Sequence, residues 1–224
     1  TAPGLRALAA RLPAELQTEQ LQARIAELDR LATMQAVPIH DRAPHFCPGC
    51  PHNTSTRVPE GSHAMAGIGC HTLAIYMDRQ TDLYTHMGAE GVPWLGMAPF
   101  VSEPHMFVNI GDGTYAHSGI LAIRQAIAAK ANMTYKILVN SAVAMTGGQT
   151  PEGELGVPEI AAQVTAEGAT KVVVVSDDPA RHQAEPRMPK GIAYHHRGEL
   201  DLVQRQLREE RGVTVLIYDQ QCAT

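Results

Sequence analysis

Two stretches decide the fold of this chain: Met106-Phe-Val-Asn-Ile110-Gly111-Asp112-Gly113-Thr114 and Tyr135-Lys-Ile-Leu-Val139-Asn140. Each begins with a run of mostly apolar, β-favouring residues and ends in glycine or in a side chain that carries oxygen. The runs are nearly continuous rather than alternating, which is typical of strands covered on both faces. Residues 117–130 between them have helical spacing, so we expect two parallel strands joined by a right-handed crossover helix.

Similar units follow along the chain. Residues 171–175 and 213–218 form two more apolar runs, and residues 158–167 and 199–211 have the pattern of helices. This alternation predicts an α/β fold with a doubly wound parallel sheet. Residues 177–198, which contain several prolines, are expected to form the longest loop.

The first 43 residues have a different pattern. Leucines recur at helical spacing among Arg, Glu and Gln over residues 5–35, with Pro13 expected to start or kink a helix and Val37-Pro38 to end the next. We therefore expect a helical arm or linker over residues 1–43 and one domain over residues 44–224. The start without Met and the end just after an apolar run also predict a piece of a longer polypeptide.

Composition excludes several classes of function. The chain has 224 residues, 44% of them hydrophobic, which is enough for one sizeable core. Its net charge is -5 and its Lys and Arg residues are scattered, so we expect no nucleic-acid or membrane-surface partner. No apolar run reaches the roughly 18 residues of a membrane span and no signal peptide is evident, which predicts a soluble, cytoplasmic protein.

The strand ends carry the candidate site. Ligands of such sheets bind beyond the carboxyl ends of the strands, where Asp112 and Asn140 lie. Gly111 and Gly113 would let the backbone approach a diphosphate, and the following helix start offers free N–H groups. Asp112 and Asn140 supply the hard oxygens that Mg²⁺ prefers. The 26 residues between Gly113 and Asn140 match the layout of the thiamine diphosphate motif.

The four cysteines suggest a second site. Cys47 and Cys50 form a Cys-x-x-Cys pair, Cys70 follows 20 residues later, and Cys222 comes after the last apolar run. Four thiolates suit either zinc or an iron–sulfur cluster, and a disulfide is disfavoured in a cytosolic chain. The spacing alone leaves zinc and iron–sulfur open.

The motifs together resemble those of the indolepyruvate:ferredoxin oxidoreductases, within the 2-oxoacid:ferredoxin oxidoreductase family. In order, they are Cys47-Pro-Gly-Cys-Pro-His52, Gly67-Ile-Gly-Cys-His71, His86-Met-Gly-Ala-Glu-Gly-Val-Pro-Trp94, Gly111-Asp-Gly-Thr-Tyr-Ala-His-Ser-Gly119 and Ala144-Met-Thr-Gly-Gly-Gln149. The resemblance covers roughly residues 44–224. The Asn140 position is a departure, because the pyruvate enzymes have Thr there.

The resemblance implies a set of site residues. It implies a [4Fe-4S] cluster on Cys47, Cys50, Cys70 and Cys222. Magnesium would be held by Asp112, Asn140 and the main-chain oxygen of Ala142. The thiamine diphosphate would be surrounded by Gly69, Cys70, His71, Gly111 and Gly113, with Thr114 and Thr146 as further contacts.

The resemblance also implies an activity: oxidative decarboxylation of a 2-oxo acid, such as indolepyruvate, to an acyl-CoA. Electrons would pass through the cluster to ferredoxin, and coenzyme A would accept the acyl group. We expect the activating Glu to come from a pyrimidine-binding domain, in the same longer chain or in a partner subunit, and the enzyme to be a homo-oligomer.

Other residues invite a role. Glu90 and His117 are candidates for a general acid or base near the cofactor. His182, His195 and His196 lack partners at ligand spacing, so we expect them at the surface.

Two alternatives stay open. One is a non-redox thiamine diphosphate decarboxylase or synthase with a structural zinc site. The other is a zinc-stabilised binding module in which Gly-Asp-Gly is only a turn.

Overall fold

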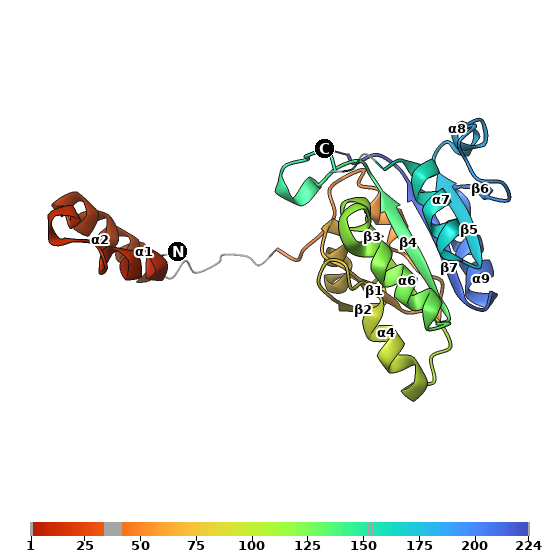
Figure 1. Cartoon of the computed structure of the whole chain (residues 1–224), viewed down its shortest axis with the longest axis horizontal. Helices are drawn as coiled ribbons and strands as arrows, with labels where there is room; N and C mark the ends of the chain where they lie inside the picture. Colours follow the sequence, from red (N-terminus) through yellow and green to blue (C-terminus); the bar gives the residue numbers. More distant parts are fainter. Residues whose placement is uncertain (1, 34–41, 152, 154, 224) are drawn as a thin grey trace. The chain divides into compact units, whose positions relative to one another are not determined.

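The computed structural model describes residues 2–33, 42–151, 153 and 155–223. The chain divides into two compact units, Thr1–Ala43 and Pro44–Thr224 (Figure 1). Among the described residues, no helix combines the length and the apolar character needed to cross a membrane.

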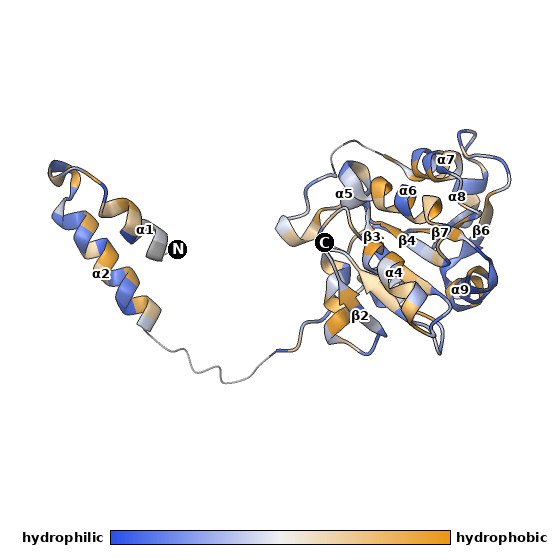
Figure 2. Cartoon of the chain, turned by 60° about the horizontal axis from the view of Figure 1, so that its bottom comes forward, coloured by the Kyte–Doolittle hydropathy of each residue, from blue (hydrophilic) through white to orange (hydrophobic). Residues whose placement is uncertain are grey.

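The first unit consists of helices that pack on each other: α1 (Ala2–Ala9), the short 3-10 turn η1 (Ala14–Leu16) and α2 (Glu19–Thr33). Pro13 precedes η1 and separates the two longer helices, as its fixed φ and missing N–H dictate. Arg6 of α1 pairs with Asp29 of α2. Hydrophilic and hydrophobic residues are interspersed along α2 (Figure 2). The predicted helix end at Val37-Pro38 lies outside the described residues.

The second unit is built on a seven-stranded sheet in which every pairing is parallel, in the order β2-β1-β3-β4-β7-β5-β6. The strands are β1 (Ala64–Ala66), β2 (Thr81–Tyr84), β3 (Met106–Gly111), β4 (Met133–Val139), β5 (Lys171–Ser176), β6 (Ala193–His196) and β7 (Val213–Asp219). This confirms the predicted doubly wound parallel sheet.

Helices and short turns connect the strands. They are α3 (His52–Ser55), η2 (Cys70–Tyr76), α4 (Val92–Met97), η3 (Ala98–Phe100), α5 (Asp112–Thr114), the π-helical turn η4 (Tyr115–Gly119), α6 (Ile120–Ala128), η5 (Ala144–Thr146), α7 (Val157–Glu167), α8 (Pro179–Gln183), η6 (Arg197–Glu199) and α9 (Leu200–Glu209). The helix predicted over 117–130 begins earlier, directly at Asp112. The strand end and the helix start are therefore consecutive residues.

The sheet has a separate core on each face. Trp94 of α4, Ile123 of α6 and Ile160 of α7 pack against strand residues such as Ile137 on one face. On the other face, Leu200, Val203 and Leu207 of α9 pack against Val173, Leu216 and Tyr218. α9 is largely hydrophilic elsewhere (Figure 2).

The segment that carries Cys47 and Cys50 lies on the face opposite α6. Lys136 stands between Tyr135 and Ile137 on β4, so its side chain points away from the core that those two residues join. Its Nζ donates to the main-chain oxygen of Arg57, at 2.8 Å, directly after α3. This bond ties the chain just after α3 to that face of β4.

The prediction of a loop over 177–198 is wrong. Pro179 occupies the first turn of α8, where its missing N–H costs nothing, and Asp178 caps that helix by accepting from Arg181 N. Gly191, at φ 86°, then turns the chain into β6, which pairs with β5 at the sheet edge. Both elements are four or five residues long, too short for periodicity to reveal them.

Candidate cofactor-binding site

Asp112 joins the ends of β3 and β4. Its Oδ2 accepts from the backbone N of Asn140 (3.0 Å) and of Ser141 (2.8 Å), and its Oδ1 accepts from Gly113 N (2.8 Å). Asn140 Oδ1 in turn accepts from Ala142 N at 3.2 Å. The carboxylate and the amide oxygen are therefore held in fixed places at the carboxyl edge.

The ionised form of Asp112 would be stabilised by a nearby positive charge. Burial raises its pKa, and the backbone N–H groups around it partly oppose that rise. A divalent cation would favour the ionised form and would find an amide oxygen and main-chain carbonyls beside it. The donor set therefore fits Mg²⁺ with phosphate oxygens completing the coordination.

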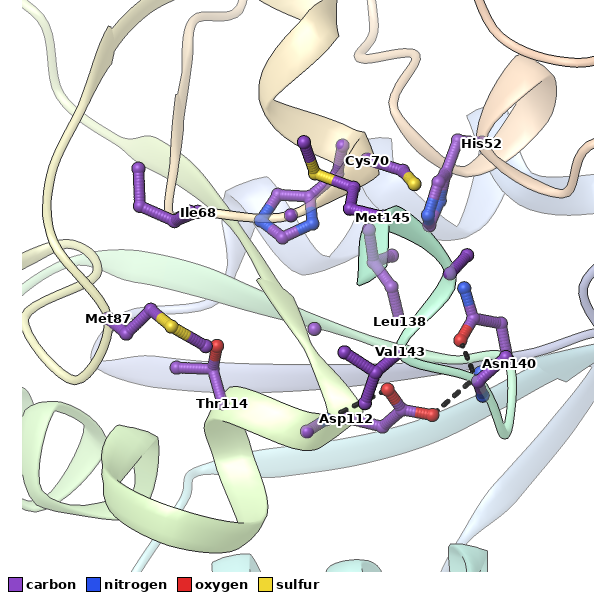
Figure 3. Close-up of a pocket in the computed structure, with 16 residues that line it drawn as sticks. His52, Ile68, Cys70, Met87, Asp112, Thr114, Leu138, Asn140, Val143 and Met145 are labelled. Atoms are coloured by element: carbon purple, nitrogen blue, oxygen red, sulfur yellow. Dashed lines mark hydrogen bonds between the residues drawn. The ribbon is translucent and has the colours of Figure 1, made fainter. Parts of the chain in front are cut away.

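A pocket of about 80 Å³ opens beside this pair. Its lining contains nine of the predicted contacts: Gly69, Cys70, His71, Gly111, Asp112, Gly113, Thr114, Asn140 and Ala142. Figure 3 shows Asp112 and Asn140 along one side of it, and Cys70, His52 and Met145 along the opposite side. The structure thus brings together residues that are up to 73 positions apart in the sequence.

His71 contributes a ready hydrogen-bonding group to this pocket. Its side chain is almost fully buried, and its Nε2 has no partner in the part of the chain that the structure describes. Burial, and then the nearby His52, lower its pKa to about 3, so the ring is neutral at physiological pH. A Cβ on Gly69 would lie 2.8 Å from the ring, so glycine is needed there. The Cε1–Nδ1 edge of the ring lies nearest to Gly69 and Gly111, so a neutral ring that carries its proton on Nδ1 could donate to a phosphate oxygen.

Three predicted residues lie outside the pocket lining. Thr146 donates to Val143 O and to Gln149 Oε1, which shapes the loop after β4. Glu90 is completely buried and accepts from Gly88 N (2.8 Å). His117 is exposed on the π-helical turn η4. Their geometry gives none of them a direct contact with a molecule in this pocket.

The four cysteines line a second cavity of about 230 Å³. Cys222 reaches it because β7 lies beside β4, and its N donates to Asn140 O at 3.1 Å. Cys70, Ala144 and Met145 line both this cavity and the pocket beside Asp112. The two cavities therefore share a wall.

The four thiols lie close enough together for their charges to interact. Burial raises the pKa of Cys70, and the neighbouring Cys50, Cys222 and Cys47 raise it further. Burial also raises the pKa of Cys50. Positive metal charge would stabilise the thiolate forms. Within the described ranges, no three His, Cys, Asp or Glu side chains converge as ligands of one metal ion. A zinc ion would need four sulfurs about 2.3 Å from a single point, whereas a four-iron cluster holds its cysteines further apart.

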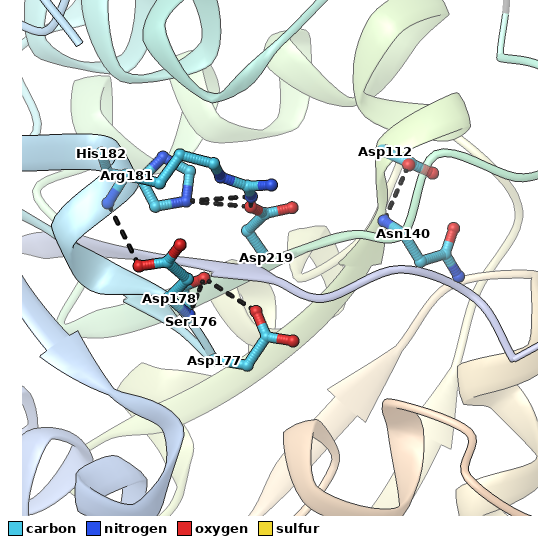
Figure 4. A network of polar contacts seen from close by, with 8 residues as sticks. All are labelled: Asp112, Asn140, Ser176, Asp177, Asp178, Arg181, His182 and Asp219. Atoms are coloured by element: carbon cyan, nitrogen blue, oxygen red, sulfur yellow. Dashed lines mark hydrogen bonds and ion pairs between the residues drawn. The ribbon is translucent and has the colours of Figure 1, made fainter. Parts of the chain in front are cut away.

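The expectation that His182 lies at the surface is wrong. Its ring is buried in α8, where its Nε2 lies 2.9 Å from Asp219 Oδ2, and Arg181 pairs with the same oxygen (Figure 4). Asp219 ends β7 opposite Val139, next to Asn140. The strand-end rule that singled out Asp112 would have found Asp219. His195 is partly exposed and His196 is exposed.

The comparisons with known proteins agree with this geometry. The family model described as thiamine pyrophosphate enzyme, C-terminal TPP binding domain, matches residues 67–197, more than half of the chain. The indolepyruvate oxidoreductase subunit IorA of Thermococcus kodakarensis is 30% identical, over 88% of this chain and 32% of the relative. The IorA subunit of Archaeoglobus fulgidus is 31% identical, over 89% of this chain and 31% of the relative.

A solved structure has a similar fold. The 2-oxoglutarate:ferredoxin oxidoreductase from Magnetococcus marinus matches with a TM-score of 0.56 and 21% identity, over 83% of this chain and 66% of that chain. The present chain spans about a third of the length of the two IorA subunits. Since the family model covers most of the second unit, the chain belongs to the thiamine pyrophosphate enzymes and carries their C-terminal TPP-binding domain.

Proposed function

We propose that this chain is the diphosphate- and magnesium-binding part of a 2-oxoacid:ferredoxin oxidoreductase. The overall reaction converts a 2-oxo acid, coenzyme A and two oxidised ferredoxins into an acyl-CoA, carbon dioxide, a proton and two reduced ferredoxins. An arylpyruvate such as indolepyruvate is the proposed substrate, because the relatives at 30–31% identity are named indolepyruvate oxidoreductase subunits.

The observation that carries the proposal is the shared wall between the two cavities. Cys70 lines the pocket of Asp112 and Asn140 on one side and the four-cysteine cavity on the other. A non-redox thiamine diphosphate enzyme has no need for four cysteines beside its cofactor. An oxidoreductase needs a one-electron acceptor close to the reacting carbon, and a [4Fe-4S] cluster on Cys47, Cys50, Cys70 and Cys222 would meet that need.

Each side of the pocket would have its own task. When bound, thiamine diphosphate supplies a nucleophilic thiazolium carbon that takes up the 2-oxo acid and releases carbon dioxide. Asp112, Asn140 and the carbonyl of Ala142 would hold Mg²⁺ against the diphosphate. Gly111 and Gly113 would let the backbone approach the phosphates, and His71 would donate from the Nδ1 edge of its ring to a phosphate oxygen.

The rest of the active site is proposed to lie elsewhere. The carboxylate that activates the cofactor would come from a pyrimidine-binding domain, in a longer form of this chain or in a partner subunit. Glu90 is a poor candidate for that role, because it is fully buried outside the pocket lining. Coenzyme A, ferredoxin and a second copy of the chain are the further proposed partners.

A calorimetric titration tests the cofactor assignment. We expect thiamine diphosphate to bind this chain in the presence of Mg²⁺ and to bind far more weakly with EDTA, because the metal offsets the repulsion between Asp112 and the diphosphate. Thiamine without phosphates serves as the control ligand and should not bind. Equal heats for thiamine and thiamine diphosphate would refute the assignment.

A further inference from the structure

His52 connects the cysteine segment to the wall of the diphosphate pocket. It follows Cys50 by two residues, its side chain is only 3% exposed, and it lines the pocket together with His71 and Asn140. Its backbone amide faces the Cys50 thiol, where it opposes the rise in pKa that burial causes. One residue thus contacts a proposed cluster ligand through its backbone and the proposed cofactor site through its ring.

The ring of His52 is fixed from three directions. Its Nδ1 lies 3.2 Å from Ser55 Oγ, within α3. The ring of Phe46 packs against it with the centroids 5.7 Å apart, and Phe46 also lines the cysteine cavity. The ring of His71 meets it edge to face, at 6.0 Å and 75°. These contacts leave His52 little rotational freedom.

His71, by contrast, depends on packing for its orientation. Its Nε2 is buried and has no hydrogen-bond partner within the described part of the chain, so no hydrogen bond at that atom fixes the plane of the ring. A Cβ on Gly69 would lie 2.8 Å from the ring and one on Gly111 would lie 3.6 Å from it, so both glycines border the ring. The edge-to-face contact with His52 supplies a further boundary. Such contacts restrict a ring to one orientation.

We propose that His52 is a positioning residue that holds the His71 ring with its Cε1–Nδ1 edge towards Gly69 and Gly111, so that an Nδ1–H can donate to a phosphate group of the bound cofactor. This inference rests on the proposed diphosphate site. Displacing His71 removes a preorganised donor, so the loss should be seen as weaker binding of the diphosphate rather than as a loss of fold.

A double-mutant cycle on binding tests the proposal. Mg²⁺–thiamine diphosphate is titrated into the wild-type chain, His52→Ala, His71→Ala and the double variant. We expect His52→Ala to weaken binding about tenfold and His71→Ala at least as much. In the His71→Ala background, His52→Ala should cost less than about twofold, because the residue it positions is gone. His52→Phe keeps an aromatic edge beside His71 and should bind within about twofold of wild type.

Each outcome decides between claims. If the wild-type chain does not bind Mg²⁺–thiamine diphosphate, the proposed function fails. If it binds, and the two histidine substitutions are additive or His52→Ala binds like wild type, the positioning role alone is refuted. Circular dichroism checks the fold of each variant. If His52→Ala does not fold, the same double-mutant cycle is measured with His52→Leu, which keeps much of the side-chain volume, and the same two outcomes apply to it. His63→Ala is the control, since His63 lies on the surface and pairs with Asp82.

Discussion

Asp112 illustrates how a single residue is placed by its neighbours. Three backbone N–H groups fix its carboxylate at the edge of the sheet, and burial raises its pKa. An amide in its place could still accept from Asn140 N and Ser141 N through its oxygen, but its nitrogen could not accept from Gly113 N. The amide would also remove the negative charge that a metal ligand at this position supplies.

Asp112→Asn should therefore abolish the effect of Mg²⁺ on thiamine diphosphate binding. We expect affinity in the presence of Mg²⁺ to fall at least about a hundredfold, while thermal stability falls only modestly, because the loss of the acceptor for Gly113 N is partly offset by the removal of a partly buried charge. Calorimetry and a thermal melt measure the two effects. Asp201→Asn on the surface of α9 is the matched control. Unchanged Mg²⁺ dependence in Asp112→Asn would mean that the carboxylate is no ligand.

Gly67 shows a second constraint at the residue scale. A Cβ there would lie 2.2 Å from Glu90 Oε1, inside a fully buried region. A shift of the Glu90 side chain away from that position would strain the bond that it accepts from Gly88 N. This close approach explains a glycine at the start of the segment that leads to Cys70.

Gly67→Ala should lower the free energy of unfolding by about 2 kcal/mol, in the range of overpacked cores. Gly96→Ala in α4 is the control, since nothing lies within 4 Å of its Cβ position. Because alanine favours helix, Gly96→Ala should be neutral or stabilising by up to about 1 kcal/mol. Urea unfolding measures both. A Gly67→Ala variant as stable as Gly96→Ala would contradict the packing described around Glu90.

At the scale of elements, β4 joins the two sites. Its end carries Asn140, and Lys136 within it donates to Arg57 O beneath the cysteine segment. Lys136 is fully buried, and its Nζ lies 5.9 Å from the centre of the Phe107 ring. Burial, and then the nearby Arg79, lower its pKa to about 7. β4 therefore contacts the chain at Arg57 through the ammonium group of Lys136, whose charged form is destabilised by burial in the folded protein.

The pH dependence of stability follows from this shift. Between pH of about 7 and the ordinary lysine value of about 10.5, the unfolded chain binds one more proton at Lys136 than the folded chain does. The contribution of Lys136 to the free energy of unfolding should therefore rise with pH across that window, by up to about 1.4 kcal/mol per pH unit. Below pH of about 7 it should be constant.

Urea unfolding of wild type and Lys136→Met at several pH values measures this contribution as a difference. The compared quantity is the free energy of unfolding of Lys136→Met minus that of wild type. We expect this difference to decrease as the pH rises from about 7 to about 10, because only the wild type releases a proton from Lys136 on folding and so gains stability as the pH rises. The contributions of the other titrating groups to the pH dependence are the same in both proteins and cancel in the difference. Parallel curves for the two proteins would show that Lys136 titrates normally in the folded chain.

At the scale of the whole molecule, the central part of the sheet could be predicted because β3, β4, β5 and β7 are long apolar runs. β1, β2 and β6 have three or four residues each, so their pairing depends on neighbours that the local sequence does not reveal. The strand-end rule placed Asp112 and Asn140 together. It could not show that His182 is buried against Asp219, or that Thr146 lies outside the pocket lining, since both depend on the path that the chain takes after a strand ends.

The cavity of the four cysteines also depends on contacts between residues that are far apart in the sequence. Cys222 is 152 residues beyond Cys70, and sequence spacing gave no reason to expect them in one cavity other than the family resemblance. The structure supplies the physical reason, since β7 lies beside β4 and carries Cys222 to Asn140. Long-range strand order therefore assembles this cavity.

The most direct test of the central claim is the iron, acid-labile sulfide and zinc content of the chain purified or reconstituted without oxygen. We expect about four iron and four sulfide per chain, little zinc, and visible absorption that decreases on reduction. Cys222→Ser should lower the iron content, whereas the conservative Ser118→Ala, outside the cysteine cavity, should not. About one zinc per chain with no sulfide, or a wild-type iron content in Cys222→Ser, would contradict the account.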